Sequence, residues 1–367
     1  MRNRRFVGSL LILATLAGMG WWQRQPLLAW WQVRELTRAN EANREVCVAR
    51  VVALEEAALP RLFDGLATAD ENVCANLESA LCGLAVRWKT ADPRSAPLLD
   101  QLRSRFATFS AAGQASALRT ATGLLNHGDE KELLPVPIAQ AAGDLLKCGQ
   151  AHEALRPQVL LLAGALIARA PPGQWLDVCR NLAHAGLRDA NPKTRVAALL
   201  LTMREAMQTE HGVLNEALPL LHDAEPTVRR AALLALGRNQ ELVTEDDLLP
   251  LLHDVDAEVQ QMCELALRGR GLQDRQLVLA RLISDESPAA RLQILQHLRG
   301  GSDVEPGVWL RRLSQDPSPA VRAAAVRAAA GQSQIDLRDR LHEMSQKDAS
   351  PTVRELAAHY LARSKQN

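Results

Sequence analysis

The sequence predicts an all-α fold: an α-solenoid of antiparallel helix pairs, preceded by an N-terminal transmembrane helix. Three observations support this. A short motif recurs six times at nearly constant spacing in the second half of the 367-residue chain. Leu and Ala dominate the composition while aromatic residues make up only 3%, which suits close-packed helices. An uncharged apolar run near the amino terminus predicts the transmembrane helix.

The amino terminus has the features of a membrane anchor. Residues 1–5 form a basic flank, and the uncharged stretch 6–22 follows. Its 17 residues reach the lower limit for a bilayer-spanning helix, about 17–25 residues. Aromatic rings that favour the headgroup layer follow at Trp21, Trp22, Trp30 and Trp31. We therefore expect a transmembrane anchor at 6–22 and a juxtamembrane segment at 23–39.

Two alternatives to an uncleaved anchor remain. A secretory signal peptide shares the basic start and apolar core, but it ends in a cleavage site with small residues. The best candidate for such a site, Gly18-Met19-Gly20, is followed by two tryptophans and is a poor one. The second alternative is a buried core helix.

The distribution of basic residues predicts the orientation. Arg2, Arg4 and Arg5 precede the stretch, whereas Arg24, Arg34 and Arg38 are spread over the segment after it. This weak bias places the amino terminus in the cytoplasm. We expect a protein anchored in a bacterial inner membrane with an extracytoplasmic body, and a cleaved secreted form is the alternative.

A repeated motif defines the second half of the chain. Its aspartates are 34, 31, 31, 31 and 32 residues apart, a spacing typical of stacked supersecondary repeats. The six copies are 189–195 (DANPKTR), 223–229 (DAEPTVR), 254–260 (DVDAEVQ), 285–291 (DESPAAR), 316–322 (DPSPAVR) and 348–354 (DASPTVR).

Each copy of the motif predicts the start of a helix. Proline suits the first helical turn, and it recurs at positions 192, 226, 288, 319 and 351. Good N-cap residues precede it in most copies, and apolar residues then return at helical spacing. Glycines stand where these helices should end, as C-cap glycines do, at Gly237, Gly269, Gly300 and Gly331. The intervening stretches, such as 246–253 and 308–313, should form the partner helices.

The Asp-x-x-Pro-x-Val-Arg pattern at about 31 residues resembles the HEAT-repeat superfamily, especially the short bacterial type also seen in phycobilin lyases. The resemblance covers 173–367 and is weakest at 254–260, where Ala257 replaces Pro and Gln260 replaces Arg. It implies an α-solenoid with a protein-binding surface and no catalytic residue.

Between residues 40 and 172 the motif fades. Amphipathic runs at 57–63, 74–88, 112–125 and 136–146, together with an apolar run at 157–170, still indicate helices. We interpret the region as degenerate repeats of the same solenoid, and a separate helical domain is the alternative.

The repeated Asp and Arg have a structural interpretation. Each Arg can reach an Asp of its own or the adjacent repeat, which gives a hydrogen-bonded ladder. The predicted ladder residues are Asp189, Arg195, Asp223, Arg229, Asp285, Arg291, Asp316, Arg322, Asp348 and Arg354. An electropositive groove for an acidic partner is the alternative.

Other chemistry finds little support in the sequence. With 43 Lys and Arg against 42 Asp and Glu, no global field points to nucleic acid. His222 and His253 recur in Leu-Leu-His-Asp, but they belong to different repeats, so no metal site is predicted. The six cysteines form no Cys-x-x-Cys pair, although Cys47 with Cys74 or Cys82 is a possible disulfide in an oxidising compartment.

These features predict a noncatalytic, membrane-tethered scaffold that binds a protein or peptide partner, with no cofactor, nucleic acid or small-molecule substrate. Arg230 and Glu264, at exposed positions of the second helices, are the candidate partner-binding residues. The alternatives are an enzyme subunit of the chromophore-lyase type and a structural envelope assembly factor.

Overall fold

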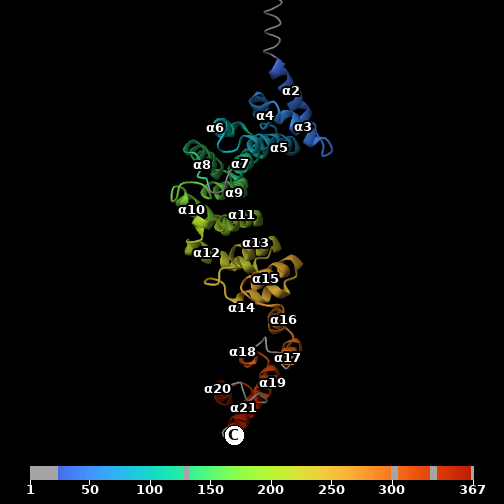
Figure 1. Ribbon diagram of the computed structural model, residues 1–367, viewed down its shortest axis with the longest axis vertical. Coiled ribbons are helices and arrows are strands. Elements are labelled where there is room, and N and C mark those ends of the chain that lie inside the picture. Colours follow the sequence, from blue (N-terminus) through green and yellow to red (C-terminus); the bar gives the residue numbers. More distant parts are fainter. Residues whose placement is uncertain (1–23, 128–131, 299–304, 331–336, 365–367) are drawn as a thin grey trace, which may run out of the picture. The chain divides into compact units, whose positions relative to one another are not determined.

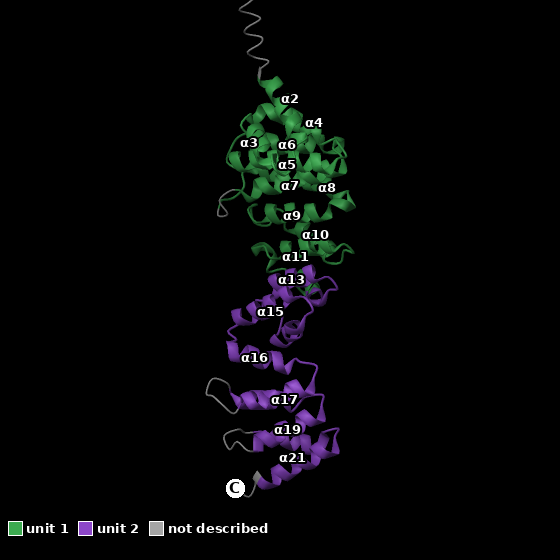
Figure 2. Ribbon diagram, turned by 90° about the vertical axis from the view of Figure 1, so that its right-hand side faces the viewer, with its two compact units in different colours: residues 1–217 green, residues 218–367 purple. Residues whose placement is uncertain are grey.

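The computed structural model describes residues 24–127, 132–298, 305–330 and 337–364 (Figure 1). Over these residues the chain is helical and contains no β-strand. It divides into two compact units, residues 1–217 and 218–367, which are coloured separately in Figure 2. The all-α prediction is confirmed over the described chain.

Unit 1 is a succession of helix pairs. Its second helices pack on one another in the order α5, α7, α9 and α11, and α4, α6, α8 and α10 are their respective partners. The helices are α2 Arg24–Thr37, α3 Arg44–Val52, η1 Glu55–Ala58, α4 Leu59–Gly65, α5 Glu71–Trp88, α6 Ser95–Arg105, η2 Phe106–Thr108, α7 Ala111–Asn126, α8 Val136–Gln150, η3 Glu153–Leu155, α9 Arg156–Ile167, α10 Leu176–Leu187, α11 Pro192–Thr202, η4 Glu205–Met207 and α12 His211–Ala217.

The packing of unit 1 runs across the expected start of the regular array at residue 173. Helix α9 packs directly on α11, although Pro171, Pro172 and Gly173 lie between them in the sequence. The division between the two compact units falls instead after Ala217.

Unit 2 pairs η5 with α13, η6 with α15, α16 with α17, α18 with α19 and α20 with α21. The elements are η5 Leu218–His222, α13 Pro226–Leu236, α14 Glu245–Leu248, η6 Leu249–His253, α15 Ala257–Gly269, α16 Asp274–Ile283, α17 Pro288–His297, α18 Pro306–Leu313, α19 Pro319–Ala330, α20 Arg338–Lys347 and α21 Pro351–Ser364. The expected partner helices at 246–253 and 308–313 are present.

All six motif copies begin a helix at the position of the recurring proline, including the copy that has Ala257 there. The motif aspartate also has a role that the sequence did not reveal. Its Oδ1 accepts the backbone N–H of the residue two positions later, at 2.7–2.9 Å in every copy. This local turn orders the chain just before the helix. At Ser287 it stands in place of the expected side-chain cap, and Glu225 likewise makes no cap hydrogen bond.

The core position nine residues after each motif aspartate is almost completely buried. Its occupants are at most 1% exposed: Ala198, Ala232, Cys263, Ile294, Ala325 and Ala357. Four of the six are alanines, and such small side chains allow neighbouring helices to approach closely.

Of the predicted glycine caps, Gly237 is confirmed as the C-cap of α13, whereas the C-cap of α15 is Arg270 and not Gly269. Gly237 follows α13 with φ of −57°, so it does not adopt the left-handed conformation. A Cβ at Gly237 would lie 2.4 Å from the Leu233 carbonyl oxygen and 3.0 Å from the Ala266 Cβ, so close packing explains this glycine. Gly269 lies within α15, and the left-handed residue is Gly271, with φ of +101°. Gly300 and Gly331 lie outside the described residues.

The predicted membrane span at 6–22 also lies outside the described residues. Within the described ranges, no helix is long and apolar enough to cross a bilayer. Most of the expected juxtamembrane segment forms helix α2, which packs on α3, α4 and α5 through buried Ala29, Val33 and Leu36.

Candidate binding groove beside the arginine–aspartate ladder

Three arginines of unit 2 each join two successive repeats. The Arg229 guanidinium donates from Nε and Nη2 to both carboxylate oxygens of Asp254, at 2.7 and 2.6 Å. Its Nη1 donates to the carbonyl oxygens of Asp223 and Ala224, in its own repeat. One side chain therefore closes its own turn and holds the aspartate of the next repeat.

The same geometry recurs twice more in unit 2. Arg291 donates to Asp316 at 2.6 and 3.0 Å, and Arg322 donates to Asp348 at 2.9 and 2.8 Å. All three arginine side chains are at most 12% exposed. Two parallel charge-assisted bonds in such a buried position fix both distance and orientation between repeats.

These contacts alter the ionisation of the paired groups. The hydrogen bond from Arg322 holds the pKa of the Asp348 carboxyl below its ordinary value. Burial opposes the charge of Asp254, but its hydrogen bonds from Arg229 and the Asp256 amide leave its pKa lowered overall. Both aspartates are therefore ionised partners at neutral pH.

Other predicted ladder residues make further contacts. In unit 1, Asp189 pairs with Arg156 at 2.7 Å, an arginine outside the motif. Arg195 and Arg354 each donate to the carbonyl oxygens of the motif aspartate and of the following residue. The sequence did not indicate Arg156 as a ladder residue, because it begins a helix in the region where the motif has faded.

The ladder is interrupted where Gln260 replaces arginine. Its amide still donates to the Asp254 carbonyl oxygen at 2.6 Å, which keeps the turn closed. The side chain is too short to reach the next repeat, and within the described chain Asp285 forms no ion pair. Helices α13 and α15, α17 and α19, and α19 and α21 pack together, whereas α15 and α17 do not pack closely on each other.

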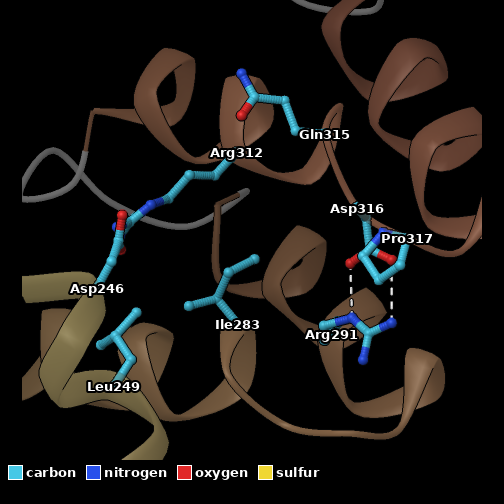
Figure 3. A pocket seen from close by; sticks show the side chains of 8 residues that line it. All are labelled: Asp246, Leu249, Ile283, Arg291, Arg312, Gln315, Asp316 and Pro317. Atoms are coloured by element: carbon cyan, nitrogen blue, oxygen red, sulfur yellow. Dashed lines mark hydrogen bonds and ion pairs between the residues drawn. The ribbon is translucent and has the colours of Figure 1, made fainter. Parts of the chain in front are cut away.

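A groove is formed by elements that precede and follow this interruption in the chain, although neither Gln260 nor Asp285 lines it. It consists of two cavities of about 300 and 390 Å³ that share Leu249 and Arg312. Figure 3 shows the first, with Arg312 and Asp246 directed toward each other and the Arg291–Asp316 pair opposite. Arg312 forms an ion pair with Asp246 and so links α18 to α14.

The second cavity adds an apolar wall and several charged groups. Its lining includes Leu272, Val308 and Trp309, with Glu245 and Glu305 beside them. Arg270 donates to the carbonyl oxygens of Gly237, Val243 and Asn239, so its charge is held by backbone dipoles. Glu245 and Glu305 form no ion pair with another described residue. The groove thus combines apolar surface with unpaired acidic charge.

The structure places the two candidate partner-binding residues in ion pairs. Arg230 on α13 pairs with Glu258 on α15, and Glu264 on α15 pairs with Arg281 on α16 at 2.7 Å. Their neighbours Leu234 and Leu265 are more exposed, at 52% and 66%. Both leucines stand 11 residues after a motif aspartate, which is the sequence signal that could have identified this exposed row.

The histidines and cysteines show no reactive arrangement within the described ranges. His222 ends η5 and His253 ends η6, and no group of three or more metal-ligating side chains forms among the described residues. All six cysteines are free thiols, so the disulfide considered for Cys47 does not form. Burial raises the pKa of the Cys179 and Cys263 thiols to about 12, far from the reactive thiolate range.

The geometry defines a protein built of stacked helix pairs with a groove between repeats. Residues 306–367 match the family model for HEAT repeats, which supports the HEAT-repeat superfamily and adds nothing on phycobilin lyases. None of the curated proteins matches the chain. A similar solved structure is that of an engineered protein from the Northeast Structural Genomics Consortium, with 13% identity, 94% coverage of each chain and a TM-score of 0.42.

Proposed function

We propose that the protein is a noncatalytic, membrane-tethered repeat scaffold that binds a protein partner in the groove between α14, η6, α16 and α18. The observation that supports this proposal is the pair of cavities that share Leu249 and Arg312. They are formed by elements that precede and follow the ladder interruption at Gln260 in the chain. Elsewhere in unit 2 the ladder arginines join the repeats directly. The second cavity is lined by none of the ladder ion pairs, so a partner segment can enter it without breaking one.

The lining indicates the chemistry of the partner segment. Apolar side chains from Leu249, Val308 and Trp309 offer surface for an apolar anchor. The unpaired carboxylates of Glu245 and Glu305 favour a basic residue beside that anchor. We propose an extended or helical peptide segment of this composition, supplied by a protein at the same membrane.

The cellular arrangement belongs to the same proposal. The stretch 6–22 anchors the chain in a bacterial inner membrane, and the repeats lie outside the cytoplasm. This follows from the apolar length and the flanking arginines. Attachment of a bilin to a co-expressed acceptor protein would contradict the noncatalytic assignment and favour the lyase alternative.

Site-specific crosslinking in native membranes tests the groove. A photoreactive p-benzoylphenylalanine in place of Val308 should capture one protein reproducibly, identified by mass spectrometry. The matched control places the same group at Arg327, an exposed position on α19 outside the groove lining. Equal capture at the two positions would contradict the proposal.

A charge exchange separates binding from folding. Arg312→Glu places two acidic side chains opposite each other and should abolish capture at position 308. The double variant Arg312→Glu with Asp246→Arg restores an ion pair between α18 and α14 with its polarity reversed. If the double variant folds like the wild type and still fails to capture the partner, the partner recognises the charge arrangement of the groove. Full capture by the single variant would exclude this groove as the site.

A further inference from the structure

Helix α2 is a fixed part of unit 1. Ala29, Val33 and Leu36 are at most 5% exposed and pack on α3, α4 and α5. The buried Asn76 amide donates to the carbonyl oxygens of Leu36 and Ala39, at 3.1 and 3.0 Å. These bonds satisfy carbonyls at the end of α2, so its orientation is set by the fold.

The opposite face of α2 exposes four large apolar side chains. Leu27, Leu28, Trp30 and Trp31 are 64%, 38%, 44% and 48% exposed. At 100° per residue, Leu27, Leu28 and Trp31 lie within about a third of the helix circumference. A contiguous apolar patch of this kind on a folded surface marks a site of interaction.

The same face becomes cationic in its second half. Arg34 and Arg38 follow the apolar residues and are exposed. The Arg34 guanidinium lies 5.1 Å from the centre of the Trp30 ring, and neither arginine forms an ion pair with another described residue. Glu35 also lies on this face, and its carboxylate pairs with Arg50 on α3 at 3.6 Å. Unpaired arginines beside tryptophans suit the phosphates of lipid headgroups.

The position of α2 in the chain indicates which surface covers this face. The helix begins at Arg24, two residues after Trp22, where the proposed anchor ends. If α2 continued straight out of the bilayer, Trp31 would lie about 13 Å beyond the hydrocarbon core, at about 1.5 Å per residue. The interfacial layer is only about 5–8 Å thick on each side. The exposed rings therefore reach that layer only if α2 turns and lies along the membrane.

We propose that the exposed face of α2 lies in the headgroup layer of the membrane and holds the first helices of unit 1 against the bilayer. The occupant of this apolar face is lipid. The proposal rests on the proposed anchor at 6–22, and it adds a second, surface contact that fixes how the first repeats are presented. The buried face of α2 transmits that orientation to α3, α4 and α5.

The test uses the full-length protein reconstituted in vesicles of phosphatidylethanolamine and phosphatidylglycerol. p-Benzoylphenylalanine replaces Trp31 in one variant and Val86 in another. Val86 is a matched control, because it is an apolar residue of unit 1 on α5 and is 44% exposed. After irradiation, mass spectrometry should find phospholipid adducts at position 31 and only background at position 86.

Alkaline extraction of the same vesicles reports on the anchor independently. Resistance to extraction with lipid adducts at position 31 supports both proposals. Resistance without lipid adducts at position 31, or with a protein adduct there, overturns the surface contact and leaves the tether intact. Extraction of the wild-type chain overturns the tether, and lipid adducts at position 31 would then still support the surface contact.

Discussion

The buried pair of Arg291 and Asp316 gives the sharpest test of how the repeats are held together. The side chains are 9% and 2% exposed, and the guanidinium makes four hydrogen bonds of 2.6–3.0 Å. The substitution Arg291→Ala removes all four and leaves the Asp316 carboxylate buried without its counter-charge. Because breaking one side of a buried ion pair costs about 3–5 kcal/mol, we expect a loss of this size in unfolding free energy.

The loss should concentrate in the repeats that the pair joins. Stacked repeats interact mainly with their neighbours, so amides of α17 and α19 should lose hydrogen-exchange protection before those of unit 1. Chemical denaturation of the full chain measures the total change. The matched control is Arg327→Ala on α19, an exposed position where a surface substitution changes stability by about 0.5 kcal/mol or less.

A second variant separates the lost charge partner from lost packing. Asp316→Asn removes the uncompensated charge, while its side-chain oxygen can still accept the Ser318 N–H that the aspartate binds at 2.7 Å. The double variant Arg291→Ala with Asp316→Asn should therefore be more stable than Arg291→Ala alone. If Arg291→Ala costs no more than the Arg327→Ala control, the ladder does not hold these repeats together and the reasoning is wrong.

Two further predictions concern the same ladder. Gln260→Arg should continue the ladder, because the new guanidinium would pair with Asp285. The unfolding free energy should rise by about 1 kcal/mol, and the amides of α15 and α17 should gain hydrogen-exchange protection. Unchanged protection would exclude an interruption of the ladder at Gln260. The hydrogen bond from Arg322 lowers the pKa of the Asp348 carboxyl in the folded state. The ionised carboxylate therefore stabilises the fold above the ordinary carboxyl pKa, and this contribution is lost as pH falls through the lowered pKa. Asp348→Asn should thus cost about 1.5–3 kcal/mol between pH 5 and 7, measured by denaturation, and the difference from wild type should shrink below about pH 4 and vanish only below the lowered folded-state pKa. A difference that does not change between pH 7 and pH 3 would contradict this assignment.

Local features of the repeats could be predicted from the sequence because they depend on residues close together in the chain. The recurring proline marks the first residue of α11, α13, α17, α19 and α21, since its fixed φ suits that position. The core position held by Ala198, Cys263 and Ile294 followed from helical spacing. In the faded region, the apolar runs at 112–125 and 157–170 were sufficient to predict α7 and α9.

The contacts between repeats were decided only by the tertiary structure. Asp189 pairs with Arg156, 33 residues earlier, which no local pattern indicates. Arg230 and Glu264 were predicted to be exposed, but both are half-buried, and neighbouring helices bring Glu258 and Arg281 within reach of them. The choice of partner depends on how adjacent helices are rotated, and helical spacing along one helix contains no information on that rotation.

The candidate groove also depends partly on features that the sequence specifies and partly on features that only the tertiary structure decides. The sequence by itself identified Gln260 as a departure from the motif, and it defined the helices on both sides. Only the structure showed that α18 approaches α14 there, so that Arg312 pairs with Asp246 across the groove. Helix formation depends on neighbouring residues and is therefore specified locally, whereas a groove exists only where elements distant in the chain pack incompletely against one another.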